Sequence, residues 1–268
     1  SSNVDLDLNL SFSRNQNEVV DIGDLASLTQ DATIGQFHVP GFPVAGIFFR
    51  RVVSATIDNS GARPVATNVM CEGGDVVPGT SFSKGGGTPV ACASAPLVYW
   101  GQPIPSREGS ASATLTLFGK LQLYGLVDYV GGHQLVSGDI AAVHRFFLNS
   151  REILERDDPI LLGYEATGQI WQPGIIDGSF AKLRTLSVNY RLPRSWASSI
   201  RAAGVSVTAA FENVATLWVG QRESFGHRQM DPEVRWSANT GTTQGLSAYN
   251  QEGWPQLKKL AATVRITY

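Results

Sequence analysis

The sequence has few charged residues and only two cysteines, and it contains no long apolar run. Charged residues make up 16% of the 268 positions, well below the roughly 25% of typical soluble domains. Hydrophobic residues reach 43%, yet no segment approaches the roughly 18 apolar residues of a membrane helix. The net charge of −2 gives no support for nucleic-acid binding. The start has no basic region followed by an apolar region, so we expect no signal peptide.

The two cysteines, Cys71 and Cys92, lie in one polar segment rich in Gly, Pro, Ser and Thr. No histidine is near them in the sequence and no Cys-x-x-Cys pair is present, so a zinc site is disfavoured. A disulfide that closes an exposed loop in an oxidising compartment is the favoured interpretation. Two free thiols remain the alternative.

Both ends of the chain alternate apolar and polar residues. In segment 260–268 the residues Leu260, Ala262, Val264, Ile266 and Tyr268 share one face, and Ala261, Thr263, Arg265 and Thr267 share the other. In segment 4–13 apolar residues alternate with Asp5, Asp7 and Asn9, and a face with two carboxylates must be wet. The pattern predicts a strand with lipid on one side and water on the other. A half-exposed strand of a soluble sandwich has the same period.

Further segments indicate strands, and one indicates a helix. Strands are predicted over 45–56, 111–118, 121–129, 183–192 and 205–211, with a tight turn at Gly119-Lys120 and a helix over 139–156 that Asp139 would cap. Pro193 can begin a short helix that ends at Gly204. The total is about seven strands of an all-β, antiparallel fold. Because segment 4–13 begins almost at residue 1, we expect the chain to be part of a longer or processed polypeptide.

The predicted connections differ in length at the two ends of the sheet. Two are short, at 119–120 and 193–204, whereas three are long, at 58–108, 131–182 and 213–258. Short turns on one side and long loops on the other are typical of outer-membrane barrels. Residues 57–109 are accordingly predicted to be one long extracellular loop. The stretch 14–42 fits this scheme poorly, since it is too long for a short turn.

Five segments carry a resemblance to a known family. They are N-L-S-F-S-R-N-Q-N-E-V (9–19), F-A-K-L-R-T-L-S-V-N-Y-R-L-P (180–193), F-E-N-V (211–214), D-P-E-V (231–234) and W-P-Q (254–256). Their order and spacing resemble the carboxyl-terminal part of SusC/RagA-type TonB-dependent outer-membrane transporters. No single segment would be specific, but the five together span nearly the whole chain.

The resemblance implies that residues 1–268 are the carboxyl-terminal part of a barrel of about 22 strands with a plugged lumen. The family's plug domain has no counterpart here. The implied function is energy-coupled import of an oligosaccharide, a peptide or a similar large nutrient across a bacterial outer membrane. The implied partners are a SusD-like surface lipoprotein, the TonB complex through the missing amino-terminal part, and lipid or lipopolysaccharide.

The pattern also predicts residues that serve this function. The lumen would be lined by Asp5, Asp7, Asn9, Asn189, Arg191, Thr263 and Arg265. Trp171 and Trp236 lie far from any predicted strand, and aromatic rings favour ligand or partner contact there. Trp100, Trp218 and Trp254 would anchor the barrel at the lipid interfaces. The terminal aromatic residue Tyr268 resembles the signal read by the barrel-insertion machinery.

Catalytic and metal motifs are weak. The four histidines are scattered, no His-Glu-x-x-His pattern occurs, and no calcium-binding Asp-rich loop is found. Asp157-Asp158 could bind a cation, although adjacent acidic residues in a loop are usually solvated. We therefore expect no enzyme, no cofactor and no metal.

Two alternatives remain open. One is a secreted β-sandwich module that binds carbohydrate through its Trp-rich loops, and the other is a small closed barrel that acts as a surface protein or adhesin. A second sheet packed on the rows that contain Leu6 and Val264 would favour the sandwich.

Overall fold

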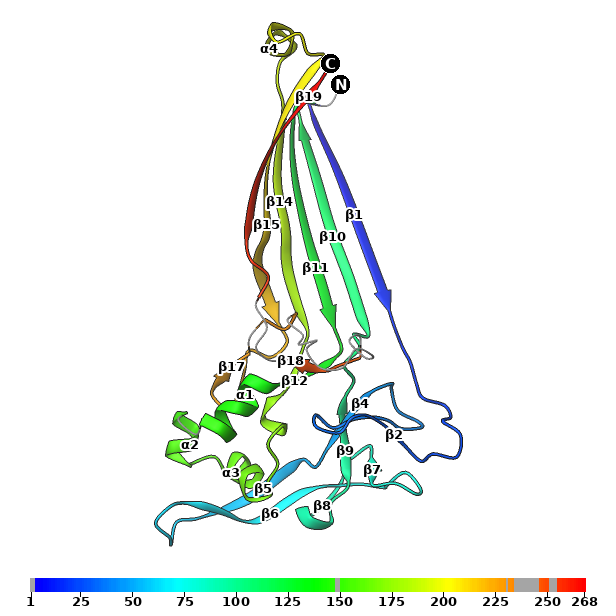
Figure 1. The fold of residues 1–268 in the computed structure, drawn as a ribbon, viewed down its shortest axis with the longest axis vertical. Coiled ribbons are helices and arrows are strands. Elements are labelled where there is room, and N and C mark those ends of the chain that lie inside the picture. The colour runs from blue at the N-terminus through cyan, green and yellow to red at the C-terminus, as the bar shows by residue number, and fades with distance from the viewer. Residues whose placement is uncertain (1–2, 148–149, 230, 234–245, 251–254) are drawn as a thin grey trace.

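Six long strands form one antiparallel sheet, which we call the wall (Figure 1). The structure is a computed structural model that describes residues 3–147, 150–229, 231–233, 246–250 and 255–268. The wall strands are β1 (Val4–Arg14), β10 (Arg107–Leu117), β11 (Leu121–Gly131), β14 (Phe180–Arg191), β15 (Gly204–Val219) and β19 (Lys259–Thr267). They neighbour one another in chain order. The predicted all-β, antiparallel barrel segment is confirmed.

The wall has six strands rather than about seven. The predicted strand over 45–56 is not part of it. That stretch forms β4 (Gly46–Phe49) and the start of β5 (Val52–Asp58), which belong to two smaller sheets. Arg50 and Arg51 separate them, and they coincide with the break in the sequence pattern.

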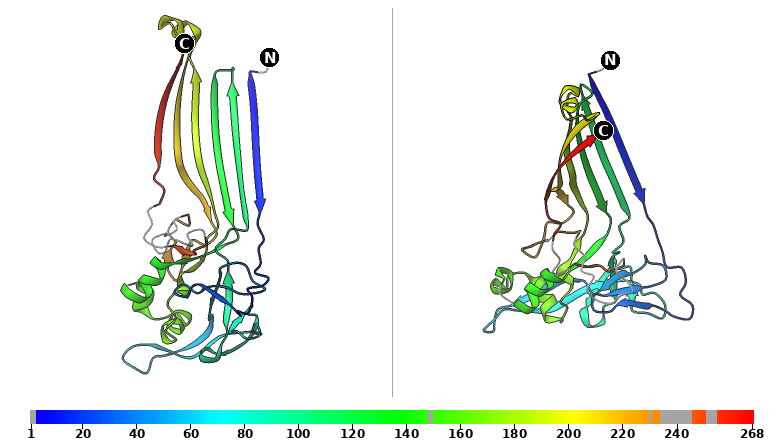
Figure 2. Two further views of the ribbon diagram at one scale, coloured as in Figure 1. Left: turned by 45° about the vertical axis from the view of Figure 1, so that its right-hand side comes forward. Right: turned by 45° about the horizontal axis from the view of Figure 1, so that its top comes forward.

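The connections divide the molecule into two ends, as Figure 2 shows. At the short-turn end, residues 118–120 join β10 to β11, and residues 192–203, with helix α4 (Arg194–Ser199), join β14 to β15. At the loop end, Arg14 pairs with Arg107, so the whole stretch 15–106 connects two adjacent strands. The length of 14–42 is thereby explained, since it is the first part of this insertion.

The described parts of the segments 15–106, 132–179 and 220–258 lie together at the loop end, and we call them the loop unit (Figure 1). Its remaining strands are β2 (Leu28–Asp31), β3 (Gln36–His38), β6 (Val65–Gly73), β7 (Phe82–Ser83), β8 (Gly87–Ala91), β9 (Leu97–Gly101), β12 (Gln134–Ser137), β13 (Ile175–Asp177), β16 (Glu223–Ser224), β17 (His227–Arg228) and β18 (Tyr249–Asn250). Residues 57–109, predicted as one loop, thus contain several strands and the start of β10.

The helices of the loop unit are short. They are α1 (Gly138–Ala142), α2 (Arg151–Glu155) and α3 (Pro159–Ala166), with a π-helical turn at Val143–Phe147 and 3-10 turns at Cys92–Ser94 and Gln172–Gly174. The helix predicted over 139–156 is therefore interrupted, and Ser137 rather than Asp139 caps α1 by accepting from the Ile140 amide. Among the described residues, no helix combines the length and apolarity needed to span a membrane.

The hydrophobic cores lie in the loop unit. One surrounds Ile34, Ile47, Val136 and Ile175, and another surrounds Val39, Phe42, Phe48 and Phe82. A third contains Val52, Tyr164 and the disulfide between Cys71 and Cys92. The predicted pairing of the two cysteines is thus present in the structure.

The alternation read from single strands continues across the whole wall. The backbone register joins Leu6, Leu115, Leu123, Val188, Ala209 and Ala262 in one row. The neighbouring row consists of Asp5, Thr116, Gln122, Asn189, Thr208 and Thr263. Successive side chains of a strand point to opposite faces, so the wall has one apolar and one polar face. Leu8 and Val264, on the apolar face, are 65% and 62% exposed, so no second sheet of the described chain covers them.

Candidate functional site

The polar face of the wall carries the side chains predicted to line a passage. Asn189 donates from Nδ2 to Thr208 Oγ1 over 2.6 Å, across the β14–β15 pair. Arg191 on β14 and Arg265 on β19 both pair with Ser206 on the strand between them. This row is the next polar row toward the short-turn end. A concave region of about 590 Å³ is lined by Asn189, Arg191, Thr263 and Arg265, among other residues.

The other predicted residues lie on the same face but in different rows. Asp5 belongs to the row of Asn189 and Thr263, whereas Asp7 and Asn9 lie in the next two polar rows toward the loop end. All seven residues therefore share one surface. Their contact with a transported solute stays a prediction.

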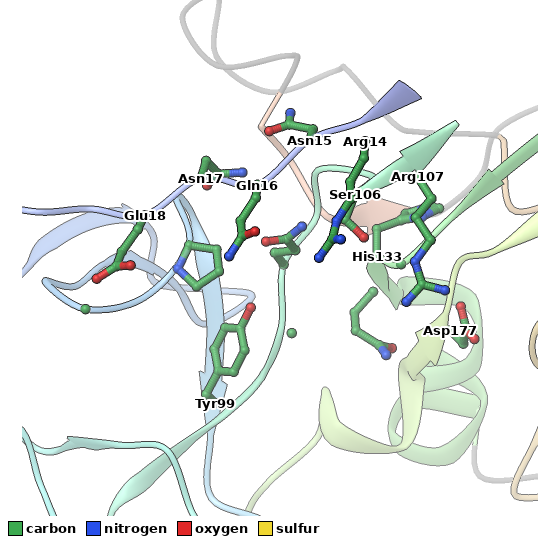
Figure 3. Close-up of a pocket in the computed structure, with 16 residues that line it drawn as sticks. Arg14, Asn15, Gln16, Asn17, Glu18, Tyr99, Ser106, Arg107, His133 and Asp177 are labelled. Atoms are coloured by element: carbon green, nitrogen blue, oxygen red, sulfur yellow. The ribbon is translucent and has the colours of Figure 1, made fainter. Parts of the chain in front are cut away.

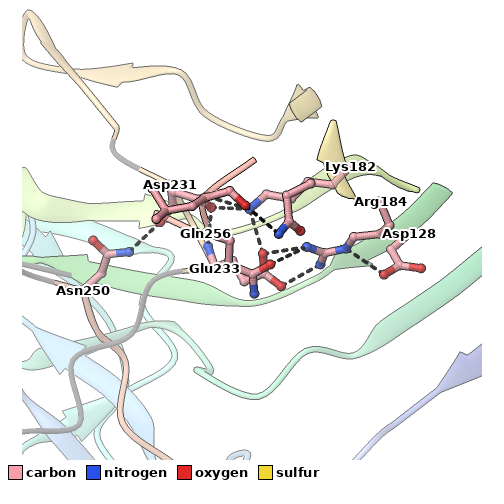
Figure 4. A network of polar contacts seen from close by, with 9 residues as sticks. Asp128, Lys182, Arg184, Asp231, Glu233, Asn250 and Gln256 are labelled. Atoms are coloured by element: carbon pink, nitrogen blue, oxygen red, sulfur yellow. Dashed lines mark hydrogen bonds and ion pairs between the residues drawn. The ribbon is translucent and has the colours of Figure 1, made fainter. Parts of the chain in front are cut away.

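A polar network fastens the loop unit to this face near the loop end (Figure 4). Lys182 Nζ lies 2.6 Å from Asp231 Oδ1 and 2.7 Å from Glu233 Oε2. Arg184 contacts Glu233 Oε1 over 2.6 Å and Asp128 Oδ2 over 2.8 Å. We call these five residues the latch.

A β-bulge shapes the latch. Against β11, the register of β14 shifts so that Val127 and Leu126 pair with Leu183 and Thr185, which leaves Arg184 as the extra residue. A bulge re-aims a side chain by placing an extra residue in one strand. As the extra residue, Arg184 joins Lys182 beside Asp128, with its Nε 2.8 Å from Asp128 Oδ2.

Ion pairing dominates the electrostatics of the latch. Burial alone would raise the pKa of the Glu233 carboxyl, but the hydrogen bonds from Arg184 and Lys182 outweigh burial and hold the pKa below its usual value. Lys182 is the most enclosed member, with 8% of its side chain exposed. An enclosed ammonium of this kind needs its carboxylates, because an unpaired buried charge is costly.

The latch joins sequence blocks that carry the family resemblance. Lys182 and Arg184 belong to F-A-K-L-R, and Asp231 and Glu233 belong to D-P-E. Arg184 also donates to Gln256 of W-P-Q over 3.5 Å, and Asn213 of F-E-N-V donates to the Leu257 carbonyl over 3.1 Å. The family resemblance rests on these blocks, but the sequence analysis did not predict the latch residues as a site. The signal was present as two basic and two acidic residues, each at i, i+2.

A second polar site lies where the wall meets the loop unit. A cavity of about 520 Å³ is lined by Arg14, Glu18, Tyr99, Arg107, His133 and Asp177, with further amide and hydroxyl side chains (Figure 3). Burial raises the pKa of the Tyr99 phenol to about 12, so this group is a neutral hydrogen-bonding group at neutral pH. Sequence reasoning missed this cavity because its residues come from distant segments.

The tryptophans that were predicted to contact ligand or lipid have different environments in the structure. Trp171 is partly buried against the core around Ile34, with its ring 5.8 Å from that of Tyr249. Packing explains Trp171, and ligand contact by it stays a prediction. Trp236 and Trp254 lie outside the described residues. Trp100 is no lipid anchor, because its Nε1 donates to the Phe49 carbonyl and Arg51 lies 4.2 Å above its ring.

Trp218 fits the predicted interface position. The register places it in one row with Phe12, Gly109, Tyr129 and Ala181 on the apolar face, and its ring stacks on Tyr129 at 6.2 Å. Tyr268, after β19 at the short-turn end, is 86% exposed. A role for Tyr268 in insertion stays a prediction.

The acidic pair at 157–158 has a structural explanation. Asp158 caps α3 by accepting from the amides of Ile160 and Leu161 over 2.8 and 2.9 Å. In the part of the chain that the structure describes, no group of three or more His, Cys, Asp or Glu side chains could hold a metal ion.

Solved structures resemble this fold, whereas scans of family models and of curated proteins give no match. A chain of the RagAB peptide importer in its closed-closed state superposes with a TM-score of 0.67 at 17% identity, over 99% of this chain and 28% of that one. The open-open state gives 0.67 at 16%, over 100% and 27%. The RagAB peptide transporter gives 0.66 at 16%, over 98% and 27%. The fold is therefore that of a segment of those chains. This chain spans little more than a quarter of those chains, and identities this low establish the fold alone.

Proposed function

We propose that this chain forms part of the wall of an outer-membrane importer for large nutrients. The observation that carries the proposal is the pair of opposed faces, one mainly apolar and one mainly polar, which extend across six strands. Lipid on one side and a hydrated interior on the other match such a sheet.

The apolar band has dimensions that suit a bilayer. It runs along β1 from Val4 to Phe12, which at about 3.3 Å per residue is roughly 26 Å before strand tilt is considered. Aromatic residues border it, with Phe12, Tyr129 and Trp218 at the loop end and Tyr190 at the short-turn end. Rings at both edges of an apolar band are typical of membrane barrels.

The other functions weighed from the sequence fit less well. A sandwich needs a second sheet over the apolar face, and Leu10 and Leu260 on that face are 79% and 76% exposed. A small closed barrel needs its first and last strands to pair, whereas β1 and β19 are the two edges of the described sheet. Open edges do not occur in lipid, so we infer that further strands complete the wall.

We further propose the solute and the partners. The similar structures are named as a peptide importer, which favours a peptide over an oligosaccharide as the solute. The likeness to the RagAB importer, together with the sequence resemblance to SusC/RagA-type transporters, favours a SusD-like lipoprotein as the partner. TonB coupling, through a plug outside residues 1–268, would supply the energy, and the outer membrane would be the location.

Uptake by the full-length polypeptide that contains this chain tests the proposal. Cells with and without its gene would receive fluorescent peptides of about five to ten residues, with and without a protonophore. We expect accumulation that needs both the gene and the proton gradient. Accumulation of oligosaccharides alone would correct the solute, and accumulation insensitive to the protonophore would contradict energy coupling.

A further inference from the structure

Two arginines follow the aromatic row at the loop end of the wall. Arg14 and Arg107 are directly opposite each other in the β1–β10 ladder, two residues beyond the pair Phe12 and Gly109. Because strand side chains alternate, they belong to the same face as Phe12, the apolar face. They therefore stand one row beyond the interface that Phe12, Tyr129 and Trp218 define.

This pairing of like charges would be stabilised by a nearby anion. Like charges directly opposite each other in an antiparallel pair are destabilising. Both side chains are exposed, and among the described residues neither guanidinium forms an ion pair with a carboxylate. By contrast, Arg184 in the latch has two carboxylate partners.

The surroundings supply further donors. Arg14 and Arg107 line the cavity of Figure 3 together with Asn15, Gln16 and Ser106. Its volume of about 520 Å³ could admit a phosphorylated headgroup. Glu18 and Asp177 also line it, but neither carboxylate is within ion-pair distance of the Arg14 or Arg107 guanidinium, and Asp177 accepts from the Ser179 amide through Oδ1.

We propose that Arg14 and Arg107 bind the phosphate of an anionic glycolipid in the outer leaflet. The inference rests on the proposed function, because it takes the apolar face to be the lipid face. Guanidinium groups match phosphate oxygens with paired hydrogen bonds. A basic side chain at the headgroup level also gains from the negative surface of an anionic leaflet.

Glycolipid binding by the purified full-length protein in detergent tests the inference. The probe is a bisphosphorylated lipid A, and the comparison probe is the same lipid after removal of both phosphates. We expect Arg14→Gln with Arg107→Gln to weaken binding of the phosphorylated probe about 30-fold, since each basic residue at an anionic surface contributes about five-fold. Arg63→Gln, an exposed arginine in the loop unit, should bind as the wild type does.

Each outcome has a clear meaning. The dephosphorylated probe should bind equally weakly to the wild type and the double variant, and Arg14→Lys with Arg107→Lys should restore part of the affinity. Equal binding of the phosphorylated probe by the wild type and the Gln variant overturns the inference, as does arginine-dependent binding of an acidic peptide instead of the lipid. Because no solute is present in the lipid assay, a failure of peptide uptake would be recognised separately.

Discussion

The wall and the loop unit are both built from strands, but the loop unit buries many apolar side chains and the wall buries almost none. Phe180, at the start of β14, is the one wall residue among the buried apolar side chains of the described chain. All four core clusters lie in the loop unit, which also contains the disulfide. The loop unit is therefore stabilised by its own cores, whereas the wall buries little within this chain and, under the proposed function, depends on lipid and on neighbouring strands.

This difference predicts different responses to mutation. A change in the loop unit should act through packing, capping or ion pairing inside this chain. A change on the wall should act according to the face on which it falls, because under the proposed function the two faces meet different solvents. The latch is where the two regions meet.

The largest effect is expected where the latch is broken. Lys182→Met leaves Asp231 and Glu233 without their ammonium, and removing one partner of an enclosed ion pair costs about 3–5 kcal/mol. In the full-length protein we expect faster hydrogen exchange and proteolysis within 220–258 while the wall stays folded. Lys120→Met, at the exposed turn between β10 and β11, is the matched control. Unchanged protection of 220–258 in Lys182→Met would contradict the role of the latch.

The pH dependence of the latch follows from the same contacts. The pKa of Glu233 is lowered, so its ion pairs contribute fully above about pH 4.5 and are lost as the pH falls through the lowered folded-state pKa. Exchange within 220–258 should therefore rise in strong acid in the wild type. The Lys182→Met variant should show less of this rise, because part of the pairing is already gone.

The wall could be predicted from the sequence because its signal is local. A period of two, with Asp5 and Asp7 opposite Leu6 and Leu8, indicates both the strand and its two environments. The register adds what no single strand contains, namely that Asp5 and Thr263 share one row across six strands. The insertion 15–106 could not be recognised, because its ends meet only once β1 pairs with β10.

The loop unit resisted prediction for a physical reason. Its strands are mostly three to five residues long or belong to small sheets, so their periodicity is too brief to detect. Its cores join residues far apart in sequence, such as Ile34 and Val136. The cavity beside Arg14 and Asp177 likewise depends on long-range contacts. The disulfide was favoured, with free thiols as the alternative, because both cysteines lie in one polar segment without a nearby histidine or a Cys-x-x-Cys pair, and the structure contains it.

The next largest effect tests the two faces of the wall. Leu8 lies in the middle of the apolar band on β1, and Leu8→Arg should destabilise the folded barrel by about 2–4 kcal/mol if that face meets hydrocarbon. Asn9→Arg, at the next position but on the polar face, should cost far less. Heat-dependent gel mobility of the full-length protein in the outer membrane measures the folded fraction. Equal losses in the two variants would contradict the assignment of the faces.

A smaller effect is a loss of stability at low pH that we expect in the loop unit but not in the wall. Burial and the neighbouring His227 lower the pKa of His144 to about 4, although Glu152 and Asp158 act in the opposite direction. Because the folded-state pKa is lowered from 6.5, stability is lost as the pH falls from about 6.5 toward 4. We expect a loss of roughly 1–2 kcal/mol after solvent screening.

Hydrogen exchange at pH 7.5 and pH 4.5 measures this loss. Protection within 138–166 should fall at the lower pH, whereas protection of β10 and β11 should not. His144→Leu should remove most of the pH dependence, and His38→Gln, at the end of β3, should leave it intact. A wall that loosens together with the loop unit would show that the two regions unfold as one.

The smallest effect concerns α3 and tests whether the acidic pair at 157–158 caps this helix or binds a cation. Asp158 accepts two amide hydrogen bonds at the start of α3, and replacing such a cap by Ala costs about 1 kcal/mol. Asp157→Ala removes the adjacent carboxylate but no capping bond, so it is the matched control. Exchange of the α3 amides should rise only in Asp158→Ala, with or without added calcium. If calcium protected α3 in the wild type and both variants abolished that protection, the pair would be a cation site. Capping would then be secondary, and the loop unit would owe part of its stability to an ion rather than to its own contacts.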